Sequence, residues 1–242
     1  MKKQARKHGG GVSRQHGRSR FEKIVFIGLH FAIIVFCVWL VHGNGITKLG
    51  LLFGTTWQFA DPQRANIALG CAVFYWLRHN ITIFYLLKRE IKWSEVFGLL
   101  AFMAVFEIGF VLIAGGIIRG YAIPIGWLDM LGFTGVIVGA YLNSFSEIER
   151  KWWKKDPTNK GHCYTQGLFK HAMHINYFGD VVLFTGWALL TANLWALALP
   201  ALMLYMFIFM HIPALDRYLT KRYGKEFETY AEHTKKLIPF IY

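Results

Sequence analysis

Apolar residues in this chain gather in long uninterrupted runs instead of alternating with polar ones. Crossing the hydrocarbon core of a bilayer takes about 20 helical residues. Four runs meet that length, at residues 24–42, 66–87, 96–115 and 125–145. Only helices and closed barrels satisfy their backbone groups in lipid, so each run predicts a membrane-spanning α-helix.

A fifth apolar run covers residues 181–215 and is too long for a single crossing. As one helix it would measure about 52 Å, against about 30 Å of hydrocarbon. A break near Asn193 or Pro200 would divide it into a hairpin of two shorter helices. The pattern therefore predicts an all-α, polytopic membrane protein with about six transmembrane helices, and we expect residues 24–242 to form a single membrane-embedded domain.

Composition supports the same class of protein. Hydrophobic residues make up 55% of the chain and aromatic residues 17%, which excludes a disordered chain and an ordinary soluble domain. Residues 1–23 are basic and rich in Gly and Ser. We expect them to be a disordered tail and not a signal peptide, because the apolar run that follows is long enough to span and lacks a small-residue cleavage site.

The distribution of positive charge predicts the topology. Of 27 Lys and Arg residues, 23 fall on one side of a six-helix arrangement, in the segments 2–23, 88–92, 150–170 and 217–236. The positive-inside rule then places both termini in the cytoplasm, and we expect a bacterial inner membrane. The net charge of +13 is accounted for by orientation and by anionic membrane lipids, so we expect no nucleic-acid partner.

The segment from Gly161 to Asp180 (GHCYTQGLFKHAMHINYFGD) is polar and contains several Gly and His residues, although it directly precedes an apolar run. Its backbone groups could not be exposed to hydrocarbon. Charge counting places it on the cytoplasmic side, next to the C-terminal segment 216–242. Both segments flank the last helical pair, so we expect them to meet and form a binding site.

Several kinds of site are excluded by the absence of their motifs. The three cysteines have no metal or redox spacing, and His171 and His174 lack a third ligand at a metal-binding interval, so we expect no metal. GxGxxG, a P-loop and GxSxG are all missing. A nucleotide would therefore have to bind the membrane-embedded fold itself.

Three motifs in order resemble the steroid 5α-reductase-like superfamily of membrane enzymes. They are FSEIERKWWKKDPTNKG, GLFKHAMHINYFGD and DRYLTKRYGKEFETYAEHTKKLIPFIY, and they cover about residues 130–242. RHNITIFYLLKR, in the first half, resembles a helix of steroid reductases more weakly. The resemblance implies NADPH-dependent reduction of a C=C bond in a lipophilic steroid-, isoprenoid- or lipid-like substrate, with residues 130–242 as the cofactor-binding half.

This chain departs from the family pattern at two positions, and the departures weaken its match to a related group of methyltransferases more than its match to the reductases. Bacterial members carry Arg and Pro where this chain has Met173 and Ile175. A related group with RHPxY here comprises isoprenylcysteine and phospholipid methyltransferases, which use S-adenosylmethionine. These usually carry paired Glu residues after the last helix, whereas this chain has the single acid Asp216. The alternatives are thus a membrane methyltransferase and a non-catalytic lipid-binding relative.

The resemblance also indicates candidate cofactor-binding residues, and each has a structural alternative. Asn176 suits a ribose or carboxamide but could cap a helix, and Gly179 allows close approach of either a ligand or a helix. Cationic side chains suit phosphates, although cytoplasmic positive charge is common. The candidates are Asn176, Tyr177, Gly179, Asp180, His174, Asp216 and Tyr230 from the motifs, with Arg150 and Arg222 as the phosphate-binding cations.

Polar residues inside the predicted spans form a second group of candidates. Arg78 and His79 lie in the second span and Glu107 lies in the third. Such groups are costly in hydrocarbon and face a cavity or one another, so an Arg78–Glu107 ion pair is one possibility. The other is a substrate cavity in which Tyr75, His79 or Glu107 is the catalytic acid. The Gln-Glu pair of steroid 5α-reductases has no counterpart here.

Overall fold

The computed structural model describes residue 17 and residues 19–242, and among them the only regular structure is helical. Most of the expected N-terminal tail lies outside the described residues. The α-helices run as follows: α1 Arg20–His42, α2 Gly45–Leu52, α3 Pro62–Asn80, α4 Trp93–Ala114, α5 Trp127–Trp153, α6 Ile175–Leu190, α7 Ala198–Met206, α8 Ile212–Tyr223 and α9 Lys225–His233.

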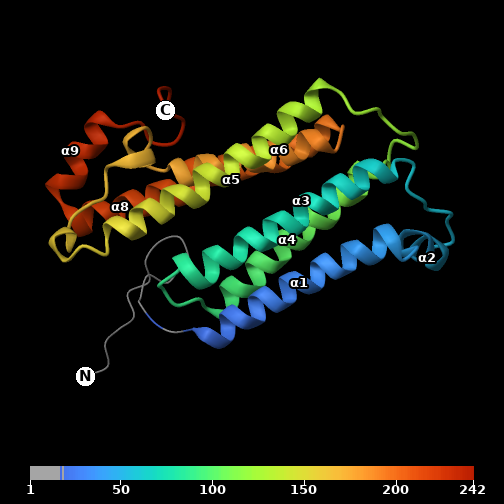
Figure 1. Cartoon of the computed structure of the whole chain (residues 1–242), viewed down its shortest axis with the longest axis horizontal. Coiled ribbons are helices and arrows are strands. Elements are labelled where there is room, and N and C mark those ends of the chain that lie inside the picture. The colour runs from blue at the N-terminus through green and yellow to red at the C-terminus, as the bar shows by residue number, and fades with distance from the viewer. Residues whose placement is uncertain (1–16, 18) are drawn as a thin grey trace.

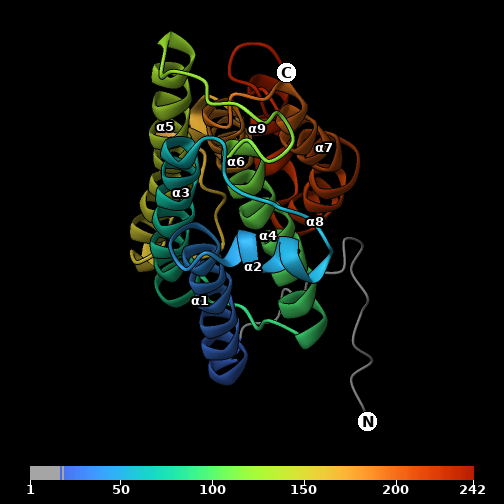
Figure 2. The same cartoon turned by 90° about the vertical axis from the view of Figure 1, so that its right-hand side faces the viewer.

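The helices form two groups that lie side by side (Figure 1). One group contains α1, α3 and α4, which pack against one another. The other contains the closely packed pair α5 and α6 with α7, α8 and α9 beyond it, and a view turned by 90° shows the same division (Figure 2). Helix α3 joins the groups through contacts with both α5 and α6.

Membrane-spanning helices are confirmed at all four of the first predicted runs. Among the described residues, five helical stretches are long and apolar enough to cross a bilayer, and α6 is a shorter apolar helix of 16 residues. Helix α3 continues through a π-helical segment, Ile81–Leu86. The protein is therefore an integral membrane protein. Helix α1 begins at Arg20, inside the stretch expected to be tail, and α2 was not predicted from the sequence.

The break in the last apolar run lies at Thr191–Asn193, near the first of the two predicted positions. Ala192 there has a left-handed φ of +52°, and the side chain of Asn193 accepts a hydrogen bond from Trp195 N. Pro200, the other candidate, lies in the first turn of α7, where proline is tolerated because backbone N–H groups there have no partner within the helix. The helix before the break begins at Ile175, six residues earlier than the apolar pattern indicated.

One end of the bundle is held by buried ion pairs. Arg64 donates to Asp129 at 2.5 and 2.9 Å and to the carbonyl oxygens of Ile123, Pro124 and Leu190. Arg119 donates to Asp61 at 2.7 Å. Since these donors have protein acceptors and are nearly inaccessible, we assign the network to structure: it ties the ends of α3, α5 and α6 together.

The opposite end carries the basic segments. Lys23 Nζ donates to Leu87 O at 2.7 Å, Ile91 N donates to Ser19 Oγ at 2.9 Å, and Lys151 Nζ donates to Tyr85 O. These contacts bring the start of α1, the α3–α4 connection and the end of α5 together. The structure thus places at one end the segments that charge counting assigned to one side of the membrane.

Glycines allow α5 and α6 to approach each other very closely. A Cβ on Gly139 would lie 2.3 Å from Leu183 N, and one on Gly179 would lie 2.5 Å from Asn143 N. A Cβ on Gly186 would likewise lie 2.5 Å from Gly132 O of α5. Small residues at a membrane helix contact bring backbones together. This contact fixes the start of α6, and with it the site described next.

Candidate functional site

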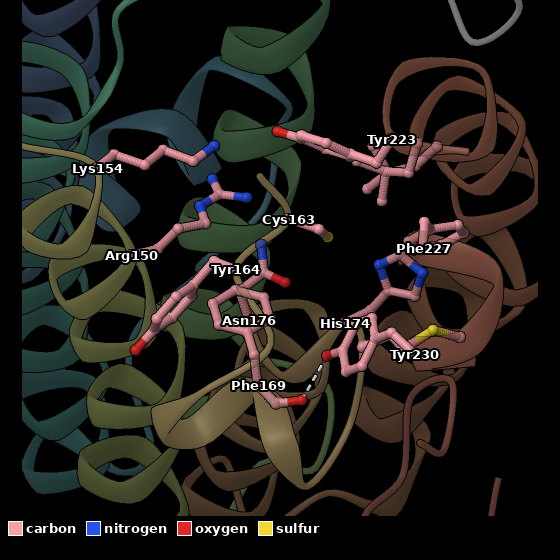
Figure 3. A pocket seen from close by; sticks show the side chains of 13 residues that line it. Arg150, Lys154, Cys163, Tyr164, Phe169, His174, Asn176, Tyr223, Phe227 and Tyr230 are labelled. Atoms are coloured by element: carbon pink, nitrogen blue, oxygen red, sulfur yellow. Dashed lines mark hydrogen bonds between the residues drawn. The ribbon is translucent and has the colours of Figure 1, made fainter. Parts of the chain in front are cut away.

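A pocket opens at the basic end of the molecule, between the end of α5, the α5–α6 connection and the C-terminal helices (Figure 3). Its enclosed space is about 70 Å³, and about 520 Å³ when the open mouth is counted. In Figure 3, Arg150 and Lys154 lie on one side, Tyr223 and Phe227 lie opposite, and Asn176 lies between them. The polar segment and the C-terminal segment therefore meet, as the sequence predicted.

The two cations of the pocket differ in their surroundings. Arg150 forms an ion pair with Glu147, while Lys154 has no hydrogen-bond or ion-pair partner among the described residues. Partial desolvation and the charges of Arg150 and Arg222 lower the pKa of Lys154 to about 8, although much of the side chain is exposed. An anion bound here would relieve this repulsion, so the residues fit a phosphate-bearing ligand.

Asn176 connects the pocket to α5. Its Nδ2 donates to Glu147 Oε1 at 3.1 Å, and its backbone oxygen accepts from Asn143 Nδ2 at 3.0 Å. Asn176 lies within the first turn of α6, and His174 occupies the N-cap position without a side-chain cap hydrogen bond. The helix-cap alternative for Asn176 is therefore wrong, and its side chain is oriented by α5 at the edge of the pocket.

The C-terminal segment forms the other wall. His174 Nε2 lies 2.8 Å from Asp216 Oδ1, and the Tyr230 hydroxyl donates to Phe169 O. The backbone of Met173 and His174 donates to the carbonyls of Lys235 and Lys236, at 2.7 and 2.9 Å. These bonds hold the C-terminal segment against the start of α6. Burial raises the pKa of the Cys163 thiol in this wall to about 11.

The remaining cofactor candidates do not line this pocket. The Tyr177 ring stacks on Phe207 with centroids 4.5 Å apart, Gly179 contacts α5, and Arg222 lies on the surface beside Tyr218. Asp180 is 3.3 Å from Arg78. For Gly179 the structure matches the helix-packing alternative.

A second polar cluster lies deep between α1, α3 and α4. His30 Nε2 is 2.6 Å from Glu107 Oε1, and both residues are fully buried. The His79 ring lies 5.0 Å from Tyr75 and 5.5 Å from His30 between centroids. The structure therefore brings the three catalytic candidates together around His30. The suggested Arg78–Glu107 ion pair is wrong, because each of the two pairs with a different residue.

Arg78 links the two clusters. Its guanidinium lies 4.9 Å from the centroid of the Tyr75 ring and donates to Asn143 and to Asp180. Asn143 in turn donates to Asn176 at the pocket. A continuous series of contacts thus runs from the membrane-embedded cluster, through Arg78 and Asn143, to the backbone oxygen of Asn176 at the basic end.

Sequence patterns did not indicate four residues of these clusters: His30, Asn143, Glu147 and Lys154. His30 had a usable signal, because a histidine in the middle of an apolar span is costly unless it faces a partner or a cavity. Asn143 and Glu147 lie near the end of α5 without a distinctive pattern. Lys154 was counted only as one of the many basic residues on its side.

The fold and the two clusters define a polytopic helical membrane protein with a polar pocket at one end. The family described as "Protein of unknown function (DUF1295)" matches residues 78–234, about two thirds of the chain. The chain belongs to this family, which is steroid 5α-reductase-like. The family suggests a membrane reductase, and it confirms the resemblance found from the sequence motifs.

Two animal relatives match most of the chain. The "3-oxo-5-alpha-steroid 4-dehydrogenase 2" of Sus scrofa is 28% identical over 209 residues, covering 81% of this chain and 76% of that protein. The human protein of the same name is 26% identical over 194 residues, covering 76% and 70%. Their names support membership of the oxidoreductases.

A fungal relative matches a shorter stretch. The "Probable O-methyltransferase ustE" of Ustilaginoidea virens is 37% identical over 92 residues. That match covers 38% of this chain and 32% of the fungal protein. The chain is thus also similar to a protein that is named as a methyltransferase.

Proposed function

We propose that the protein is a membrane-embedded, NADPH-dependent reductase of a C=C bond in a lipophilic substrate. The observation that carries the proposal is the pocket at the basic end, where Arg150, Lys154 and Asn176 converge from α5, its C-terminal end and α6. The positive charge of Lys154, which has no ion-pair partner among the described residues, lies next to an oriented amide and suits a phosphate-bearing nucleotide. The steroid dehydrogenase names of two relatives point to the same chemistry.

Within this proposal, the pocket residues bind and orient the nucleotide. Arg150 and Lys154 contact phosphate oxygens, and Asn176, held by Glu147, donates to or accepts from the ribose or carboxamide. His174, Asp216 and Tyr230 hold the C-terminal wall in place. Tyr177, Gly179 and Asp180 position the start of α6, and Arg222 adds positive charge nearby. Bound NADPH would supply a hydride to one carbon of the double bond.

The membrane-embedded cluster would receive the substrate. Reduction also requires a proton at the second carbon and polarisation of the double bond by an adjacent carbonyl. Tyr75, His79 and Glu107 are the titratable groups at that depth, and a lipophilic molecule can reach them from the bilayer. Arg78 and Asn143 connect this cluster to the pocket, so a movement of these side chains when a ligand binds at one site would affect the other site.

Isotope transfer tests the proposal directly, because the labelled product itself identifies the substrate. NADPH deuterated at the transferable position is incubated with the purified protein and a lipid extract of the native host, and the lipids are analysed by mass spectrometry. We expect one lipid species to gain deuterium with the wild type, and Asn176→Ala and Asp180→Ala to abolish the transfer. Arg217→Gln, an exposed cation outside the pocket, is the control. Deuterium in no lipid would contradict the reductase.

A second candidate, an S-adenosylmethionine-dependent membrane methyltransferase, is favoured by the 37% identity to the fungal protein. The same lipid extract distinguishes it. S-adenosylmethionine with an isotopically labelled methyl group should leave the lipids unlabelled if the protein is a reductase. Label in a lipid, dependent on Asn176, would establish the methyltransferase instead.

A further inference from the structure

We propose that the C-terminal loop, residues 235–242, anchors the C-terminal wall of the pocket to the membrane surface at the basic end. Three apolar side chains at its tip (residues 240–242) lie among the lipid headgroups, and the two lysines at its start bind anionic lipid phosphates. The anchor does not depend on the proposed function, because this lipid contact forms with or without a nucleotide.

The tip of the loop exposes large apolar side chains outside the membrane spans. Phe240 is 82% exposed, Ile241 is 74% exposed and Tyr242 is 42% exposed. They follow one another in the chain and lie beyond the last spanning stretch, Leu194–Tyr223. An exposed apolar patch next to charged residues marks a surface that contacts a protein or a membrane.

The backbone holds the tip in this exposed position. Leu237 N and Ile238 N donate to Tyr242 O at 2.6 and 2.8 Å, so the chain closes on itself. The Leu237 side chain is fully buried and ties the loop to the protein. Phe240 has a left-handed φ of +67°, which is unfavourable for a residue other than glycine. The exposure is therefore a property of a folded loop and not of a frayed chain end.

The loop lies at the level where the spanning helices end. Its backbone bonds to residues 173 and 174 place it directly before the start of α6. There Asn176 donates to Glu147, one helical turn before Lys151 of α5, and Lys151 donates to the end of the α3 span. In Figure 1 the chain likewise returns from α9 toward the start of α6. The tip is thus at headgroup level, where aromatic side chains are enriched in membrane proteins.

Charge favours an anionic lipid surface over a protein partner. Lys235 and Lys236 are exposed just before the apolar tip, and Lys170 is exposed beside Thr234 in a surface hollow next to the loop. Basic residues beside an interfacial apolar segment attract anionic headgroups, while their alkyl chains extend along the apolar surface. A second copy of the chain docked through the same loop would bring these lysines against their own counterparts, and like charges would repel.

Contact between the loop and the membrane reaches the pocket through two hydrogen bonds. Met173 and His174 line the pocket, and their backbone donates to Lys235 O and Lys236 O at 2.7 and 2.9 Å. A loop held at the membrane keeps these acceptors in place, so the C-terminal wall opens less often. Anionic lipid therefore stabilises this wall of the pocket.

Fluorescence quenching of a single label tests whether the tip lies in the bilayer. An environment-sensitive dye is attached to Ile241→Cys and, as a control, to Glu228→Cys, which is exposed on α9. Both variants are made in the full chain without its three native cysteines and reconstituted in nanodiscs of phosphatidylcholine and phosphatidylglycerol. We expect a lipid with a nitroxide near its headgroup to quench the dye at position 241, and aqueous iodide to quench the dye at position 228.

Two outcomes of this measurement would overturn the anchor. Iodide quenching of equal strength at both positions would place the tip in water. Protection of position 241 from both quenchers would show that a protein surface, such as a second copy of the chain, covers the tip instead of lipid.

Amide exchange tests the two lysines in protein that keeps its native cysteines and has no nucleotide present. Deuterium uptake by the peptide containing Met173 and His174 is compared in phosphatidylcholine nanodiscs with and without phosphatidylglycerol. We expect anionic lipid to slow the uptake by up to about tenfold, the effect of two lysines near a charged surface. The Lys235→Gln, Lys236→Gln double variant should exchange equally in both lipids. Lys225→Gln, which changes an exposed lysine on α9, is the matched control and should keep the full difference.

Equal uptake by the wild type in the two lipids, or a difference that survives in the double variant, would overturn headgroup binding by the loop. Neither the quenching nor the exchange measurement uses NADPH. The anchor therefore stands or fails independently of the reductase proposal.

Discussion

Lys154 is the residue whose chemistry most directly reflects an anion site. Desolvation and two neighbouring guanidinium groups lower its pKa to about 8, from 10.5 for a free lysine. In the unliganded protein this lysine therefore loses its charge as the pH rises through about 8, where an ordinary lysine is still protonated. A bound phosphate favours the charged form and competes with this loss.

We predict that affinity for NADPH falls as pH rises from 7 to 9, by up to about tenfold, because the free protein must then take up a proton at Lys154 on binding. The dissociation constant measured across this range checks the prediction. Lys154→Arg keeps its charge and should show a flat profile, and Lys154→Gln should be uniformly weak. An identical pH dependence in all three proteins would remove Lys154 from the site.

At the residue scale, motifs and the cost of polar groups in hydrocarbon singled out several residues that the structure places in the two clusters. Asn176, His174 and Tyr230 were found through the motifs, and Glu107 through its cost in hydrocarbon. Asn143 and Glu147 could not be found in this way, because they act through the close contact of α5 with α6. That contact depends on three-dimensional packing, which spacing along one helix does not reveal.

At the scale of elements, the α5–α6 contact positions the pocket. A Cβ at Gly179 would lie 2.5 Å from Asn143 N and 2.8 Å from Gly139 O, both backbone atoms that cannot turn aside. A side chain here must separate the helices. Asn176, one turn earlier in α6, would then move away from Glu147.

We therefore predict that Gly179→Ala lowers stability by about 1–3 kcal/mol, the usual cost of overpacking, and also weakens nucleotide binding. Thermal unfolding in detergent and an NADPH titration measure the two effects. Gly109→Ala on α4 is the matched control, since an added Cβ there meets nothing within 4 Å. A Gly179 variant as stable and as tightly binding as this control would refute the packing role.

The start of α6 shows why element boundaries were harder to predict than elements. Polar residues from Asn176 to Asp180 made the segment resemble a loop before an apolar span. In the structure they lie in the first turns of a helix, where the Asn176 side chain donates to Glu147 of α5 at the edge of the pocket and Asp180 accepts from Arg78. A helix pairs its own backbone N–H and C=O groups, so a segment with polar side chains at the membrane boundary can still be helical.

At the scale of the whole molecule, apolar run length and charge distribution predicted most of the architecture. The spans and the need for a break in the last apolar run follow from length, and the gathering of basic segments at one end follows from charge. Length did not decide between Asn193 and Pro200 as the position of the break. The packing of α1, α3 and α4 around a polar centre did not follow, because it depends on which faces of apolar helices meet. The sidedness of the membrane remains a prediction from the positive-inside rule.

Cysteine labelling in intact cells tests that sidedness. In a background lacking Cys37, Cys71 and Cys163, Lys48→Cys and Lys155→Cys place single thiols at opposite ends of the bundle. We predict that an impermeant maleimide labels Lys48→Cys in intact bacterial cells and labels Lys155→Cys only after the membrane is permeabilised. The reverse pattern would place the nucleotide pocket outside the cytoplasm and exclude NADPH as its ligand.

We propose that the pocket formed by Arg150, Lys154 and Asn176 binds a nicotinamide nucleotide. Calorimetric titration of the purified protein with NADPH and, separately, with S-adenosylmethionine tests it most directly. We predict saturable binding of NADPH that Asn176→Ala abolishes, and no binding of S-adenosylmethionine. Saturable binding of S-adenosylmethionine alone would contradict it.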